Sequence, residues 1–145
     1  MTRSFTGAKT ESYLDTSALI AALDQSDIYH RLFARLFAHP PALVASALVI
    51  AEGHGWFLRR YDSTRALQFL DFISELPRLT IEPFGPEALE PTTEVLKKYA
   101  DQSLTATDAH GLAIMRSRRI RFCWSTDRHL GLNGAALVIS HARRS

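Results

Sequence analysis

Long apolar runs, paired cysteines and a dominant sign of charge are all missing from this sequence of 145 residues. No run approaches the roughly 18 apolar residues that a membrane-spanning helix needs, and the beginning of the chain holds no hydrophobic block of signal-peptide length. The single cysteine, Cys123, can form neither an internal disulfide nor a four-thiolate zinc site. These absences predict a cytoplasmic protein with no membrane contact.

Composition and charge indicate one ordinary folded domain. Hydrophobic residues make up 46% of the chain and charged residues 22%, which excludes a disordered or low-complexity protein. The 17 Lys and Arg against 15 Asp and Glu give a formal net charge of +2, which identifies no class of partner. Without an internal repeat or a linker, residues 1–145 are expected to form a single domain, with residues 1–10 as a loose lead-in.

Short apolar stretches alternate with longer helical segments along the chain. Helical stretches of such length exclude hairpins between consecutive strands and favour a parallel sheet covered by helices on both faces. We therefore expect the α/β class, as a three-layer α/β/α sandwich with a mainly parallel sheet of about five strands. Ligands of such sheets bind beyond the carboxyl ends of the strands. The expected strands are 12–15, 43–45, 79–84, 121–124 and 136–139, and the expected helices are 17–23, 28–37, 46–60, 62–76, 86–100 and 105–118.

Four acidic residues fall at this edge of the sheet or on an apolar helix face. Asp15 closes the first strand, and Asp127 follows the fourth. Glu52 has apolar residues at i−4, i−3 and i+4, which predicts a carboxylate on the buried face of its helix. Asp108 begins a helix and shares a face with Leu112. All four side chains are thus expected at one site.

Each acid also has a simple structural interpretation, although Glu52 on an apolar stripe fits one least well. Asp15 could cap the helix after it, Asp108 stands three residues after Thr105 as in a capping box, and Asp127 is a typical turn residue. Convergence at one edge favours a shared site instead. Carboxylates buried together need a cation, and Mg²⁺ or Mn²⁺ fits an all-oxygen ligand set better than zinc.

Four blocks in this order carry a family resemblance: residues 13–19 (YLDTSAL), 46–52 (SALVIAE), 99–109 (YADQSLTATDA) and 125–130 (STDRHL). The chain resembles a PIN-domain nuclease, in particular a VapC-type toxin of a type II toxin–antitoxin pair. The resemblance implies an endoribonuclease that hydrolyses RNA phosphodiesters through a metal-activated water, with Mg²⁺ as cofactor and Mn²⁺ able to replace it. It assigns the catalytic metal ligands to Asp15, Glu52, Asp108 and Asp127, an auxiliary acid to Asp101, and orienting hydrogen bonds to Thr16, Ser17 and Thr126.

Two positions depart from the family pattern. Gly53 and Gly55 loosen a helix where stronger helix formers would be expected. Leu130 stands where relatives often have Phe. Neither change removes an acid, so both bear only on local geometry.

Basic and apolar side chains suggest partner surfaces. Arginines near the last acid are expected to hold an RNA backbone, although a solvated helix end would explain them equally well. Most apolar residues in 28–37 and 67–73 are expected to pack in the core, and any exposed excess would suit a homodimer or an antitoxin helix. Phe122 and Trp124 are also expected in the core. The proposed RNA-binding residues are Arg116, Arg118, Arg119, Arg121 and Arg128, with Arg59, Arg60, Lys97 and Lys98 as weaker candidates.

Three other functions remain open at this point. A catalytically idle PIN-like module would bind RNA or a protein without cleaving. An aspartyl-phosphate enzyme built on Asp15 usually carries a second Asp two residues on, where this chain has Ser17. A metal-free ribonuclease would need two histidines to meet, and His54 and His110 lie on other helix faces than the neighbouring acids.

Overall fold

A parallel five-stranded sheet forms the centre of the computed structural model, which describes residues 11–140. The strand order is β3-β2-β1-β4-β5, and every neighbouring pair is parallel. The predicted α/β architecture is therefore confirmed, while the lead-in expected at residues 1–10 lies outside the described residues. The strands are β1 (Ser12–Leu14), β2 (Leu43–Ser46), β3 (Leu79–Glu82), β4 (Phe122–Trp124) and β5 (Ala136–Leu137).

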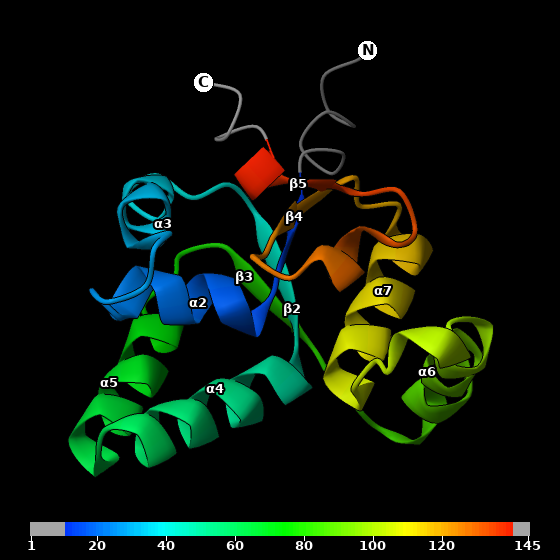
Figure 1. Ribbon diagram of the computed structural model, residues 1–145, viewed down its shortest axis with the longest axis horizontal. Helices are drawn as coiled ribbons and strands as arrows, with labels where there is room; N and C mark the ends of the chain where they lie inside the picture. The colour runs from blue at the N-terminus through cyan, green and yellow to red at the C-terminus, as the bar shows by residue number, and fades with distance from the viewer. Residues whose placement is uncertain (1–10, 141–145) are drawn as a thin grey trace.

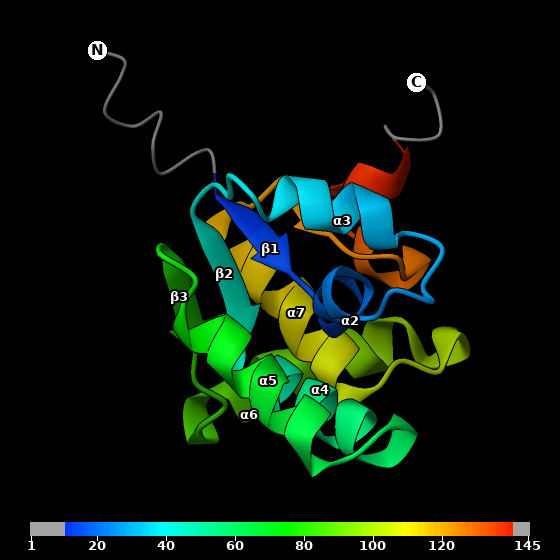
Figure 2. The ribbon, with the colours of Figure 1, turned by 90° about the vertical axis from the view of Figure 1, so that its left-hand side faces the viewer.

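Helices cover both faces of this sheet. Helices α2, α3 and α5 lie on one face and α6 and α7 on the other, while α4 leaves the carboxyl end of β2 and packs against α5 (Figures 1 and 2). No helix in the described part of the chain is long and apolar enough to cross a membrane. The helices are α2 (Thr16–Leu23), α3 (His30–Leu36), α4 (Ala47–Arg60), α5 (Ser63–Ser74), α6 (Pro86–Lys98) and α7 (Ala106–Arg118), with short 3-10 turns η1 (Ala100–Gln102) and η2 (Arg128–Gly131).

Side chains in the sequence fix where the helices begin. The Ser46 hydroxyl accepts a hydrogen bond from the Leu48 N–H, and the Asp62 carboxylate accepts one from Arg65 N–H. Pro86 fills the first turn of α6, where a missing N–H removes no helical hydrogen bond. The sequence predicted these starts within a residue, whereas the helix expected to reach residue 76 ends two residues earlier, at Ser74.

Of the two β4 residues that were expected in the core, Trp124 is buried and Phe122 is exposed. Trp124 is only 4% exposed and meets the ring of Phe37 at a centroid distance of 4.9 Å. Phe122 is 45% exposed, so its predicted burial is wrong. It opens the strand, and the α3 rings that cover Trp124 leave this first position in contact with solvent.

Gly53 marks the closest approach of α4 and α5. A Cβ atom built at this position overlaps the ring of Phe69, which is fully buried. Glycine at this point is therefore required by the helix contact rather than being a weakness of α4. We expect Gly53→Ala to lower the free energy of unfolding by about 1–2 kcal/mol, because overpacking outweighs the gain in helix propensity.

Gly55 provides the matched control for this prediction. A Cβ there meets only the flexible guanidinium of Arg59, at 3.0 Å. Gly55→Ala should therefore stabilise the chain by up to about 1 kcal/mol through helix propensity. Urea unfolding of both variants measures the difference, and equal stabilisation by the two substitutions would contradict the packing argument.

Candidate metal centre

A cavity of about 330 Å³ opens at the carboxyl edge of the sheet. The four acids expected at one site all line it, from four separate segments of the chain: Asp15 after β1, Glu52 on α4, Asp108 on α7 and Asp127 after β4. The right-handed run of parallel strands thus brings together residues that are more than a hundred positions apart.

Asp15 is the most deeply buried of these acids, with 4% of its surface exposed. Its Oδ2 accepts hydrogen bonds from the hydroxyls of Ser17, at 2.7 Å, and Ser125, at 2.9 Å. The pKa of Asp15 is raised to about 6, because burial and the charge of Asp108 together outweigh the lowering effect of the hydrogen bonds from Ser17 and Ser125. Near neutral pH the site therefore contains an ionised carboxylate that a cation would stabilise.

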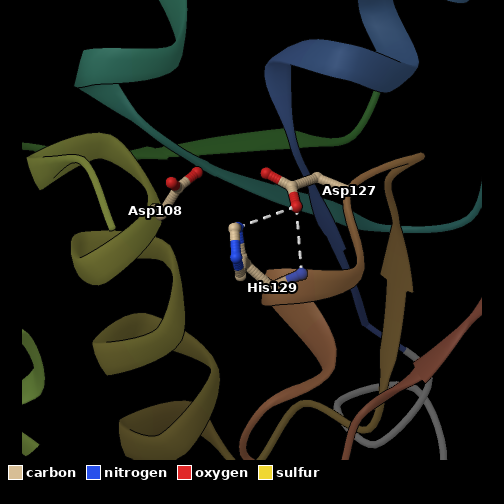
Figure 3. A group of neighbouring side chains, drawn as sticks. All are labelled: Asp108, Asp127 and His129. Carbon is tan, nitrogen blue, oxygen red and sulfur yellow. Dashed lines mark hydrogen bonds and ion pairs between the residues drawn. The ribbon is translucent and has the colours of Figure 1, made fainter. Parts of the chain in front are cut away.

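Asp108 and Asp127 face each other across the cavity, with His129 beside them (Figure 3). Ligand atoms of these three side chains lie within 4.8 Å of one another. Asp108 shares a capping box with Thr105, in which each residue's side chain accepts the other's backbone N–H at 3.1 Å. Asp127 Oδ1 accepts the backbone N–H of His129 at 2.9 Å and lies 3.2 Å from that residue's Nδ1.

Residues 12–132 match the sequence profile of the PIN domain. This match spans most of the chain and includes all four acids of the cavity. The chain belongs to the PIN domain family. No curated protein matches the sequence significantly.

Solved structures of other PIN-like proteins share the fold. VapC20 of Mycobacterium tuberculosis, described as a toxin that cleaves the sarcin-ricin loop, matches with a TM-score of 0.77 and 23% identity over 86% of this chain and 95% of that one. VapBC2 of Rickettsia felis, bound to a promoter DNA fragment, matches with a TM-score of 0.60 and 15% identity, over 88% of this chain and 97% of that one. A toxin–antitoxin complex of Klebsiella pneumoniae matches with a TM-score of 0.58 and 17% identity, over 87% of this chain and 94% of that one.

The PIN domain of this chain has the oxygen atoms that a divalent cation needs. One oxygen of each aspartate is engaged, whereas Asp15 Oδ1, Asp108 Oδ1 and Asp127 Oδ2 accept no hydrogen bond from any described residue. The hydroxyl of Thr16 is buried at the cavity and also has no partner in the described part of the chain. Hard oxygen ligands of this kind suit Mg²⁺ or Mn²⁺, so the residues present fit such an ion.

Glu52 reaches the cavity from a different environment than the sequence predicted. The buried stripe of α4 runs through Val49, Gly53 and Phe57, and Glu52 lies beside this stripe in an exposed position. Its predicted place on the buried face is therefore wrong. The apolar neighbours Leu48 and Trp56 are themselves only partly buried, and Trp56 lines the cavity beside Glu52.

The predicted RNA-binding arginines do not gather at this cavity. Three of them lie at the far end of α7 or just before β4: Arg116, Arg119 and Arg121. Although they are close to Asp127 in sequence, the length of β4 separates them from it in space. Arg118 forms ion pairs with Glu11 and Glu82. Arg128 is exposed next to Asp127, while Arg59, which had lower weight, lines the cavity itself.

The remaining predicted residues differ in how they meet the cavity. Ser17 orients Asp15 directly, whereas Thr126 acts through its backbone N–H, which donates to the Ser17 hydroxyl at 2.9 Å. Asp101 is exposed in η1, accepts a hydrogen bond from the Gln102 amide and does not line the cavity.

Sequence reasoning missed two polar contributors. The Ser125 hydroxyl donates a hydrogen bond to Asp15, whereas the sequence predicted this role for the neighbouring Thr126. His129 joins Asp108 and Asp127. The signal for both was present, because each belongs to the block of residues 125–130 that contains Asp127.

Proposed function

We propose that this PIN domain is the endoribonuclease toxin of a toxin–antitoxin pair, and that it hydrolyses RNA phosphodiester bonds with Mg²⁺, which Mn²⁺ can replace. Asp15, Glu52, Asp108 and Asp127 are the proposed metal ligands. The observation that carries the proposal is the set of three aspartates that share one cavity and each leave one oxygen without a partner among residues 11–140. This arrangement fits a cation and not an isolated helix cap.

The chain's own groups prepare this site for an anionic substrate. Ser17 and Ser125 hold Asp15 in one rotamer, and the Thr105 capping box does the same for Asp108. A divalent ion bound there supplies charge neutralisation at a phosphate and a more acidic water. Arg59, at the wall of the cavity, places a positive charge where phosphate oxygens would lie.

Metal removal tests the proposal directly. We expect the purified protein to cleave RNA in Mg²⁺ or Mn²⁺, to stop in EDTA, and to recover when the ion is added back, as followed on denaturing gels. Calorimetry of the same sample with Mg²⁺ alone should show uptake. Absence of both cleavage and uptake would instead favour a catalytically idle module.

The proposal includes a cognate antitoxin protein. It is supported by the fold shared with the Klebsiella toxin–antitoxin complex and with VapBC2. Three large apolar side chains on helices or turns of one half of the molecule, Ile28, Leu58 and Leu67, are 88%, 46% and 58% exposed, which suits a protein partner. A homodimer and a cytoplasmic location remain predictions, which sedimentation and cell fractionation would test.

A further inference from the structure

A second hollow, of about 400 Å³, lies at the opposite end of α7 from the acids. Four cationic side chains and one amide line it: Lys98 from the end of α6, Arg116 and Arg119 from the end of α7, Arg121 before β4, and Asn133 before β5. We name it the basic hollow. Because these residues come from separate segments, the fold rather than local sequence brings the charges together.

These four cations have no counterion within the described residues. Lys98 lies over the ring of Tyr99, at 5.2 Å, and none of the four forms an ion pair there. Arg118 offers a direct contrast, because it occupies the same turn of α7 and is neutralised by Glu11 and Glu82. Like charges left together repel one another, so the basic hollow is arranged for an anionic occupant.

The backbone at Arg119 supports this assignment. Its φ is 58°, in the left-handed region, at a helix end where glycine is usual. A residue with a side chain is strained there, and such strain is concentrated at positions with a function. The turn at Arg119 leads directly into Arg121, so both side chains reach the same hollow.

The distance between the two sites decides what the hollow can hold. Arg116 lies slightly more than two turns after Asp108 on α7, which places the two residues about 12 Å apart along the helix axis. Figure 1 shows α7 running beside the sheet along the direction of the strands, so that its two ends lie toward opposite ends of the strands. The hollow is therefore too far away to touch the phosphate that is cut, but within reach of the same strand a few nucleotides away.

We propose that the basic hollow binds the phosphate backbone of the substrate RNA outside the cleaved segment. This rests on the proposed function, under which RNA is already held at the acids, so that a second contact is intramolecular and needs little affinity of its own. Arginine and amide donors suit phosphate oxygens of any sequence, so the hollow adds affinity and not base specificity. An acidic peptide is the competing occupant.

The test variant is Arg116→Gln/Arg119→Gln/Arg121→Gln, with Arg31→Gln/Arg35→Gln/Arg78→Gln as a control that removes equal charge from exposed positions outside the hollow. Binding of single-stranded RNAs of about 4 and about 16 nucleotides is measured by fluorescence anisotropy in Mg²⁺ over a salt series, with every variant placed in the Asp15→Asn background to slow cleavage. For the long RNA we expect at least a tenfold loss in the test variant and a salt slope shallower by about 2, for three lost phosphate contacts. The short RNA should bind all variants alike.

Cleavage assays separate this proposal from the proposed function. With the long RNA, the test variant should show a raised KM and an unchanged kcat. Equal losses in test and control variants, or no loss in either, would overturn the basic hollow as an RNA site even if cleavage is intact. Loss of binding to a polyglutamate peptide with RNA binding unchanged would assign the hollow to an acidic protein. RNA bound at the hollow without any cleavage would refute the nuclease alone.

Discussion

Asp15→Asn is expected to lower RNA cleavage at least about 100-fold, since loss of groups that only support metal ligands already costs 10- to 100-fold. The substitution keeps the size of the side chain and an oxygen that accepts the Ser17 and Ser125 hydrogen bonds. It removes the negative charge at the most buried position of the cavity. Asp108→Asn should have a similar effect, because it removes the charge while its amide oxygen can still accept the Thr105 N–H of the capping box.

Single-turnover cleavage at saturating Mg²⁺ measures these losses. The control is Asp71→Asn, which removes the same charge from an exposed position on α5. This control should cleave as the parent does. Parent-like rates in both cavity variants, with metal content verified, would rule out the proposed chemistry. Asp101→Asn is informative in the same assay, because a large loss there would give this exposed acid the auxiliary role that the sequence suggested.

The same Asp15→Asn variant is expected to be more stable than the parent by about 2–3 kcal/mol at pH 7 without metal, at 1.36 kcal/mol per pKa unit. Burial raises the pKa of Asp15 from 3.8 to about 6. The folded parent therefore binds a proton more tightly than the unfolded chain does, and the stability from this proton is present at low pH. It is lost as the pH rises from about 4 to about 6.

Urea unfolding in EDTA between pH 4 and pH 8 tests this sign. The gap between variant and parent should be near zero at the acid end and reach its full size above pH 6. Mg²⁺ should narrow the gap at pH 7, because an ion that binds only the folded parent stabilises it. A variant less stable than the parent at pH 7 would show that Asp15 acts only through its hydrogen bonds.

Much of this architecture could be predicted because it depends on local chemistry. The alternation of apolar strands with long helical stretches excluded hairpins and predicted a parallel sheet. The residue types at Ser46, Asp62 and Pro86 predicted where three helices begin. The acids at Asp15 and Asp127 converge because parallel strands all point the same way. None of these inferences needs knowledge of distant contacts.

The errors arose where distance along the chain differs from distance in space. Arg116, Arg119 and Arg121, which are near Asp127 in sequence, lie across a strand and at the far end of a helix from it. Glu52 was expected to be buried because the apolar residues around it were assigned to one face, although the buried face is centred on Val49 and Phe57. Gly53 was expected to weaken α4, but the Phe69 ring packs so closely against it that no side chain fits there.

Helix capping leaves free the carboxylate oxygens that the proposed cation would need. Asp15, Asp108 and Asp127 each cap a helix or turn with one oxygen, and the other oxygen is left for the cavity. If the proposed nuclease function holds, a duplicated gene released from selection for cleavage would still be constrained at these positions by the capping hydrogen bonds. Its descendants would be expected to carry Asn, Ser or Thr there rather than Ala, so inactive descendants would preserve the outline of the ancestral catalytic centre.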